Sequence, residues 1–214
     1  DLQGPKIRIE RFKNKKILLK DGETFVLDAK LGVNDGTEER VGISYKALPG
    51  DVKRGDTLLL DDGRIVLWVN EATDHEVNCR VVMGGELSDR KGINRQGGGL
   101  SAPALTGKDR DDIKLAAQMQ ADYLAVSFVR HAQDVNEARA LLRAAGGHGG
   151  IVAKIERAEC LEVVDEIIDA SDAIMIARGD LGVEIGDAAL PPVQKRLIHS
   201  ARVRNRVAIT ATQM

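Results

Sequence analysis

Two short apolar runs in the sequence end abruptly in charged residues. Residues 151–156 finish with Lys154 and Glu156, and residues 173–180 finish with Asp180. Two carboxylates beside one ammonium are the groups that a divalent cation would need to hold a substrate that carries a phosphate. The alternative is a structural ion pair, because such pairs are common where sheets meet loops.

The segment between these runs repeats its apolar residues at helical spacing, which predicts a strand, a helix and a strand over residues 151–177. A crossover helix joins parallel strands, so the charged ends of both strands emerge at one edge of the sheet. Side chains two positions apart on a strand share a face, so Lys154 and Glu156 point the same way. We therefore expect Glu156 and Asp180 to converge, with Lys154 beside them.

Strands and helices alternate throughout the second half of the chain. Thr106 and Asp109 have the spacing of a capping box at the start of a helix. The alternation predicts an α/β fold with a parallel sheet, for which a (β/α)8 TIM barrel is the natural closed form. Only four strands are predicted, so we expect a partial TIM barrel cut from a longer protein. The predicted elements are helices at 106–120, 132–145, 158–170 and 192–203, and strands at 123–128, 151–156, 173–177 and 207–212.

The first half of the chain has a different pattern. Short β-type runs separated by turn signals predict a small all-β barrel domain. Asp62-Gly63, between two apolar runs, is a strong hairpin signal. Gly4-Pro5 and Gly97-Gly98-Gly99, at the two ends of this region, are typical of a hinge. The predicted strands are 6–11, 16–19, 24–27, 40–44, 57–60, 64–69 and 76–82.

Composition argues against several classes of function. The chain is 43% hydrophobic with a formal net charge of −2, so neither nucleic acid nor a membrane surface is favoured as a partner. The first hundred residues carry few aromatic side chains, which does not support a stacking groove for nucleic acid. No apolar window is long enough to cross a membrane and no signal peptide is recognisable, so we expect a cytoplasmic protein. Cys79 and Cys160 lie in no metal-binding spacing, and we expect them to be buried and unpaired.

Six motifs carry a resemblance to one known family. They are Gly4-Pro5-Lys6-Ile7-Arg8, Asp61-Asp62-Gly63, Arg90-Lys91-Gly92-Ile93-Asn94, Ala153-Lys154-Ile155-Glu156, Ala177-Arg178-Gly179-Asp180-Leu181-Gly182 and Thr210-Ala211-Thr212-Gln213-Met214. In this order and spacing they resemble the central section of pyruvate kinase. The resemblance implies that residues 1–4 are the end of the third barrel strand and a hinge. It implies that residues 5–99 are an inserted β-barrel lid domain and that residues 100–214 are part of the TIM-barrel catalytic domain.

The resemblance also assigns roles to site residues. Glu156 and Asp180 resemble the protein ligands of a catalytic Mg²⁺ or Mn²⁺. Lys154 resembles the group that stabilises charge on the transferring phosphoryl group and on the enolate oxygen. The backbone amides of Gly179 and Asp180 resemble the cradle for the substrate carboxylate. Thr212 resembles a hydroxyl implicated in protonating the enolate of pyruvate.

The activity that the resemblance implies is transfer of the phosphoryl group of phosphoenolpyruvate to ADP, giving pyruvate and ATP in glycolysis. Arg8 and Lys91 match positions that meet nucleotide phosphates as the lid closes. A lid-closing role for Asp62 is the weaker interpretation, because an Asp-Gly pair is first of all a turn former. The resemblance further implies a homotetramer for the full-length protein and an inactive isolated segment.

A departure from many members of the family concerns the monovalent cation. Members that require potassium resemble one another in carrying a threonine, a lysine and a glutamate where this chain has Leu2, Gln3 and Lys6. Losing the threonine removes an oxygen ligand for potassium, while Lys6 brings an ammonium that can stand in for the ion. The chain therefore resembles the potassium-independent type. The alternative is that Lys6 points to solvent at a domain boundary.

Two other classes of function stay open at this point. Arg178-Gly179-Asp180 could be an adhesion motif, but it follows an apolar strand in a chain without a secretion signal. Another Mg²⁺-dependent barrel enzyme that acts on phosphoenolpyruvate or pyruvate, such as an aldolase, is the second alternative. Such enzymes lack the inserted β domain, so residues 6–96 argue against it.

Overall fold

The computed structural model describes residues 1–211, in which the chain forms two compact units. One unit combines residues 1–5 with the chain from residue 103 onward, and the other is formed by residues 6–102. We call them the α/β unit and the β unit. Each unit has its own buried apolar core. In the described part of the chain, no helix is both long enough and apolar enough to span a membrane.

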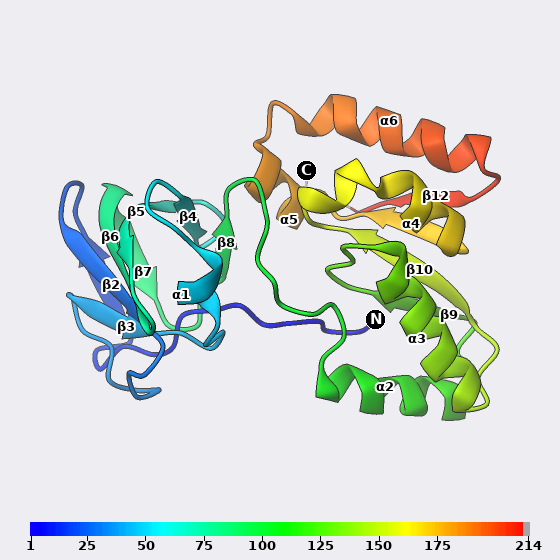
Figure 1. The fold of residues 1–214 in the computed structure, drawn as a ribbon, viewed down its shortest axis with the longest axis horizontal. Helices are drawn as coiled ribbons and strands as arrows, with labels where there is room; N and C mark the ends of the chain where they lie inside the picture. The colour runs from blue at the N-terminus through cyan, green and yellow to red at the C-terminus, as the bar shows by residue number, and fades with distance from the viewer. Residues whose placement is uncertain (212–214) are drawn as a thin grey trace. The chain divides into compact units, whose positions relative to one another are not determined.

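The α/β unit is built on a parallel sheet with the strand order β12-β11-β10-β9 (Figure 1). The strands are β9 (Tyr123–Val126), β10 (Gly150–Ile155), β11 (Ala173–Ile176) and β12 (Val207–Thr210). Their spatial order follows the chain order, so each crossover places the next strand beside the last one. β10 is one of the two inner strands, and its apolar residues are buried in the core of the unit. The predicted parallel α/β sheet is confirmed.

Helices connect these strands and follow one another along the sheet (Figure 1). They are α2 (Gly107–Gln118), α3 (Ala132–Ala144), α4 (Val164–Ala170), α5 (Arg178–Ile185) and α6 (Leu190–Val203), with a 3₁₀ turn at Glu159–Glu162. The prediction of one helix over residues 158–170 was wrong in detail. The backbone leaves helical geometry at Val163, where φ is −116°, so a 3₁₀ turn precedes a shorter α4.

The first residues of the chain lie beside β9. The Leu2 N–H donates to the Ala125 carbonyl over 2.9 Å, and the Ser127 hydroxyl donates to the Leu2 carbonyl over 2.8 Å. The Leu2 side chain is 1% exposed and belongs to the core of the α/β unit. The segment therefore joins the sheet edge at the end of β9.

Asp109 fixes the start of α2 and the segment beside it. Its carboxylate accepts hydrogen bonds from the Thr106 N–H (2.8 Å), the Thr106 hydroxyl (2.6 Å) and the Gly4 N–H (3.1 Å). The predicted capping box of Thr106 and Asp109 is confirmed. Burial by itself would raise the pKa of Asp109, but these hydrogen bonds outweigh it and lower that pKa below its usual value.

We expect Asp109→Asn to lower the free energy of unfolding of the full-length protein by about 1–3 kcal/mol at pH 7, because buried hydrogen bonds are lost. The pKa of Asp109 is lower in the folded protein, so its stabilising contribution is present above the unfolded pKa of about 3.9. That contribution is lost as the pH falls further, through the folded pKa. The difference between the variant and the parent should therefore shrink in acid, as measured by urea unfolding at a series of pH values.

Asp111→Asn is the matched control, since Asp111 lies on the same helix with a side chain that is 76% exposed. It should change the unfolding free energy by less than about 0.5 kcal/mol. Equal losses for the two variants at pH 7 would contradict the structural role of Asp109.

The β unit contains a six-stranded sheet with the order β3-β2-β6-β5-β4-β8 and a two-stranded pair β1-β7. The strands are β1 (Lys16–Leu19), β2 (Thr24–Asp28), β3 (Arg40–Gly42), β4 (Thr57–Leu60), β5 (Ile65–Ala72), β6 (Glu76–Met83), β7 (Gly85–Ser88) and β8 (Ile93–Arg95), with a short helix α1 (Leu48–Asp51). The hairpin predicted at Asp62-Gly63 is confirmed, because β4 and β5 pair with Leu60 opposite Ile65. The Arg64 N–H donates to the Asp61 carbonyl over 3.1 Å, and the central residues Asp62 and Gly63 have φ angles of 57° and 82°, as a tight hairpin turn requires.

The predicted strand at residues 6–11 was wrong as a continuous element. Arg8 forms an isolated bridge with Gly92, whereas Ile9 forms one with Ile43. The segment therefore pairs through its backbone with Gly92, just before β8, and with Ile43, just after β3. These are the two ends of the six-stranded sheet, so the segment links its edges. Its residues pair with two different partners in turn, which prevents a regular ladder with either.

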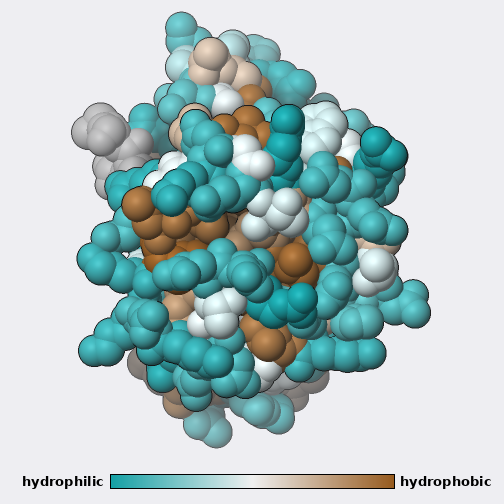
Figure 2. All heavy atoms as spheres, turned by 90° about the vertical axis from the view of Figure 1, so that its left-hand side faces the viewer, coloured by the Kyte–Doolittle hydropathy of each residue, from teal (hydrophilic) through white to brown (hydrophobic). Residues whose placement is uncertain are grey.

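The surface of the β unit, seen in Figure 2, is mostly hydrophilic with hydrophobic side chains exposed between polar ones. Trp68 is 40% exposed, whereas Phe12 and Phe25 are buried in the core. Cys79 in this unit and Cys160 in the α/β unit are buried and free, as predicted. Burial raises the pKa of both thiols to about 12, which keeps them protonated and unreactive.

Candidate active site

Three of the residues predicted to take part in the chemistry lie at the carboxyl ends of β10 and β11. They are Lys154, Glu156 and Asp180. In the parallel register Lys154 lies opposite Met175 and Ile155 opposite Ile176, and the Ala177 N–H continues the ladder to the Ile155 carbonyl over 3.2 Å. Glu156 is the first residue after β10. Asp180 lies in the first turn of α5, directly after β11. The sheet thus places both carboxylates at one edge.

Lys154 and Glu156 form an ion pair with 2.9 Å between Nζ and Oε1. The side chains are 16% and 2% exposed, so the pair is largely removed from water. The Lys154 ammonium also donates to the Ser127 hydroxyl over 2.9 Å, and it lies 3.4 Å from the carboxylate of Asp1. Ser127, which follows β9, and the first residue of the chain therefore orient the ammonium together with Glu156.

Glu156 is held by the backbone as well as by Lys154. Its Oε2 accepts the Phe128 N–H over 2.6 Å, at a residue whose φ of 56° is unusual for a side chain of this size. Burial raises the pKa of Glu156, and the nearby charge of Asp180 raises it further. The hydrogen bond and charge of Lys154 and the Phe128 N–H oppose this shift without cancelling it.

Asp180 raises the pKa of Glu156 because like charges at one edge of the sheet repel each other. A cation between two such groups would relieve both the repulsion and the cost of burial, and carboxylate oxygens are the ligands that Mg²⁺ and Mn²⁺ prefer. Within residues 1–211, no three His, Cys, Asp or Glu side chains gather as a metal site. The residues fit a cation with two protein carboxylates, whose remaining positions would go to water and substrate oxygens.

The start of α5 adds an anion-binding feature to this edge. The helix begins at Arg178, and its N-cap Ala177 has no side chain that could accept a hydrogen bond from the first turn. Backbone N–H groups at a helix N-terminus attract anions. Gly179 and Asp180 lie in that first turn, as the sequence predicted. Arg178 donates from Nε to the Ala211 carbonyl over 2.9 Å, which ties this turn to the chain after β12.

Two candidate nucleotide-binding residues lie in the β unit. Arg8 pairs with Gly92, and the Ile9 N–H donates to the Lys91 carbonyl over 2.9 Å, so Arg8 and Lys91 lie on neighbouring chain segments. The Lys91 ammonium is 2.8 Å from the carboxylate of Asp61. Asp62 is exposed in the turn after β4, which agrees with its interpretation as a turn former.

Some residues of the site were not found from the sequence. Ser127 and the Phe128 N–H contact Lys154 and Glu156, and the only signal for them was their place after the apolar run 123–126. Asp1 was likewise not recognised as a neighbour of Lys154. Thr212, the predicted proton donor, lies outside the described residues.

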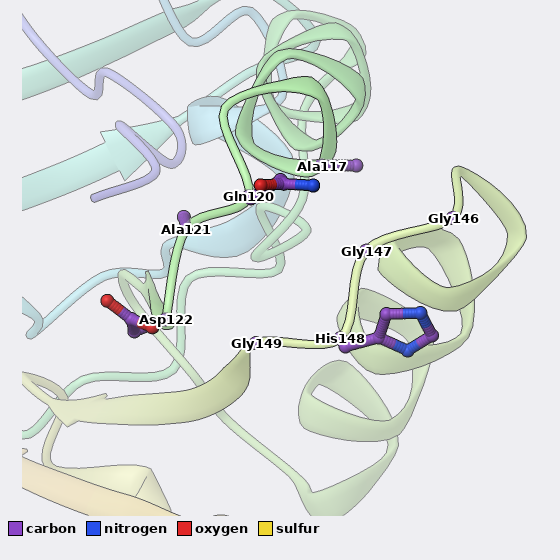
Figure 3. A pocket seen from close by; sticks show the side chains of 8 residues that line it. All are labelled: Ala117, Gln120, Ala121, Asp122, Gly146, Gly147, His148 and Gly149. Atoms are coloured by element: carbon purple, nitrogen blue, oxygen red, sulfur yellow. The ribbon is translucent and has the colours of Figure 1, made fainter.

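A separate cavity of about 280 Å³ lies in the α/β unit. It is lined by residues that precede β9 and β10, so it is at the amino ends of the strands, away from Glu156 and Asp180. Figure 3 shows that the imidazole of His148 points away from Asp122. The two side chains therefore do not form a common ligand set. The lining residues are Ala117, Gln120, Ala121, Asp122, Gly146, Gly147, His148 and Gly149.

Comparison with known proteins gives a match over the whole chain. A model of the family described as "Pyruvate kinase, barrel domain" matches residues 1–214. A pyruvate kinase of Buchnera aphidicola subsp. Acyrthosiphon pisum is 58% identical over 217 residues, covering 100% of this chain and 45% of that protein. Pyruvate kinase II of Salmonella typhimurium is 57% identical with the same coverage. A pyruvate kinase of Thermotoga maritima is 42% identical over 214 residues, covering 100% of this chain and 46% of that protein. The chain thus spans less than half the length of these relatives.

Proposed function

Because the chain belongs to the pyruvate kinase family, we propose that the protein containing it transfers the phosphoryl group of phosphoenolpyruvate to ADP and forms pyruvate and ATP. The observation that carries the proposal is the convergence of Lys154, Glu156 and Asp180 at one edge of the parallel sheet. A largely buried ammonium and carboxylate, with the exposed carboxylate of Asp180 beside them, suit phosphoryl transfer, where catalysis is mostly positioning and electrostatic stabilisation.

In this proposal Glu156 and Asp180 hold Mg²⁺ or Mn²⁺, which when bound would neutralise charge on the phosphoryl oxygens. Lys154 stabilises the charge that develops on the transferring phosphoryl group and on the enolate oxygen. The amides of Gly179 and Asp180 bind the substrate carboxylate, and Thr212 takes part in protonating the enolate. Each role follows the family motif at the matching residue.

The proposed architecture is a partial TIM barrel with an inserted β-barrel lid. Residues 1–4 form the end of the third barrel strand and a hinge, residues 5–99 form the lid, and residues 100–214 form part of the catalytic barrel. The split of the chain into an α/β unit and a β unit supports this division. Arg8 and Lys91 of the lid would meet the phosphates of ADP. We further propose a cytoplasmic homotetramer, and no turnover by residues 1–214 alone.

The test is pyruvate release from phosphoenolpyruvate by the full-length protein, with and without ADP. We expect release only when both ADP and a divalent cation are present. Release that does not depend on ADP would contradict phosphoryl transfer to a nucleotide, and it would favour an enzyme of the aldolase type.

We also propose that the enzyme needs no potassium ion. Leu2 offers a buried apolar side chain, which supplies no oxygen ligand to a monovalent cation. Lys6 is exposed and follows the hinge proline, where its ammonium can supply the positive charge instead. We expect potassium to change activity by less than about twofold in tetramethylammonium salts at fixed ionic strength, which controls for general screening.

Lys6→Glu should create a dependence on potassium, because it removes the charge that replaces the ion. Lys13→Glu, a change of another exposed lysine in the β unit, is the control and should leave the salt response unchanged. Many-fold activation of the parent enzyme by potassium would rule the idea out.

A further inference from the structure

Glu184 is a buried carboxylate that has no role in the site described above. It lies in α5, one turn after Asp180, and is 5% exposed. Its Oε2 accepts the N–H of Ala158 over 2.8 Å. Ala158 is the second residue after Glu156. This hydrogen bond therefore joins the helix that carries Asp180 to the segment that follows Glu156.

The geometry of α5 makes this link relevant to the metal pair. Residues four apart on a helix are neighbours on its surface, so Glu184, which contacts the segment after β10, lies next to the more exposed Asp180 on α5. The pairing of β10 with β11 fixes where the backbone leaves each strand, just before Glu156 and shortly before Asp180. On the helix side, the contact between Glu184 and Ala158 is a second fixed point. The strand pairing and the Glu184 hydrogen bond together restrict the distance between Glu156 and Asp180 more than the strand pairing alone would.

Other charged residues lie in the same part of the α/β unit as Glu184. Arg157 is 3% exposed, and its Nε lies 2.7 Å from the Glu159 carboxylate. The charges of Glu159 and Glu184 raise the pKa of the buried Cys160 thiol, while the charge of Arg157 lowers it. A buried carboxylate is destabilising unless it is paired or hydrogen-bonded. An apolar residue would avoid that cost but could not bind the Ala158 N–H.

We propose that Glu184 is a positioning residue that holds Glu156 and Asp180 at the separation a divalent cation requires, acting through the Ala158 N–H. The inference rests on the proposed function of Glu156 and Asp180 as metal ligands. It goes beyond that function by assigning the preorganisation of the pair to a residue that does not touch the metal. Partners of this kind typically change metal affinity by about 10–100-fold.

The first test is a Mn²⁺ titration of the full-length enzyme, in which electron paramagnetic resonance measures the free Mn²⁺. Glu184→Ala removes the acceptor and should weaken Mn²⁺ binding about 10-fold. Glu184→Gln keeps an oxygen at the same position and should stay within about threefold of the parent. Hydrogen exchange of the metal-free enzyme should be faster at residues 156–162 in Glu184→Ala than in Glu184→Gln.

Asp172→Ala is a matched control for general destabilisation. Asp172 accepts the Ile151 N–H over 2.7 Å and pairs with Arg139, but at the amino end of β10. Loss of the Asp172 carboxylate should lower the melting temperature without changing the affinity for Mn²⁺. If Asp172→Ala and Glu184→Ala weakened Mn²⁺ binding equally, the effect of Glu184 would be one of overall stability, and the proposal would be overturned.

The second test removes the same hydrogen bond from the donor side. Ala158 has φ −64° and ψ −42°, a φ that proline adopts, so Ala158→Pro deletes the N–H with Glu184 unchanged. We expect Ala158→Pro to weaken Mn²⁺ binding about as much as Glu184→Ala. The double variant should be no weaker than either single one, because both remove one interaction.

The outcomes separate this inference from the proposed function. If the parent enzyme binds Mn²⁺ and Glu156→Gln weakens it, but Glu184→Ala and Ala158→Pro do not, only the positioning role fails. If Glu156→Gln has no effect on Mn²⁺ binding, the metal site itself is wrong. Additive effects of Glu184→Ala and Ala158→Pro would also overturn the positioning role.

Discussion

Replacing Lys154 by methionine is expected to lower kcat for phosphoryl transfer by roughly 10³-fold or more while the enzyme still binds Mn²⁺. Methionine keeps much of the volume of the lysine stem but removes the ammonium. In a site that is largely removed from water, a fixed positive charge stabilises a developing negative charge far more than it would in solution. Lys154, only 16% exposed, is in such a setting.

The measurement is steady-state kinetics of the full-length Lys154→Met enzyme, together with Mn²⁺ binding and thermal unfolding. We expect a fall in kcat with Mn²⁺ affinity within about threefold of the parent. Lys108→Met, at an exposed lysine on α2, is the control and should leave kcat unchanged. A Lys154→Met chain that unfolds, or that binds no Mn²⁺, would favour a structural ion pair instead.

The second large effect is expected on metal binding. Glu156→Gln and Asp180→Asn keep the shape of each side chain but remove its charge, so each should weaken Mn²⁺ binding by at least about tenfold, or about 1.4 kcal/mol. That is more than an exposed ion pair contributes. Glu156 should show the larger loss, because it is 2% exposed and solvent cannot replace its charge.

Asp165→Asn is the control for this titration. Asp165 pairs with Arg204 on the surface of the α/β unit, with a side chain that is 57% exposed. Its change should leave Mn²⁺ affinity unaltered. Unchanged affinity in either Glu156→Gln or Asp180→Asn would remove that residue from the metal site.

Much of the α/β unit could be predicted because its sequence pattern is strong. Mostly apolar runs such as 151–155 are typical of buried parallel strands. The alternation of strands with helices indicated that the charged carboxyl ends of these strands lie at one edge of the sheet. The contact between Lys154 and Glu156 followed from strand periodicity alone. The break at Val163 could not be predicted, since the apolar spacing of residues 158–170 suits one continuous helix.

The partners that support the site were harder to predict because they come from distant parts of the chain. Ser127 reaches Lys154 across the sheet, and the Phe128 N–H reaches Glu156 only because the backbone turns at a positive φ. In the sequence Glu184 has the pattern of an ordinary helical glutamate, and only its burial in the structure distinguishes it from exposed glutamates. In the β unit, the residues around Arg8 pair with two segments in turn, which no local pattern indicates.

The most direct test of the central claim follows the phosphorus atom itself. Phosphorus-31 resonance spectra of phosphoenolpyruvate and ADP with the full-length enzyme would be recorded with Mg²⁺ and again after its removal by a chelator. With Mg²⁺, we predict that the phosphoenolpyruvate signal decays as the γ-phosphate signal of ATP grows, and that neither changes without the metal. Growth of inorganic phosphate in place of ATP, or equal transfer without a divalent cation, would contradict the account.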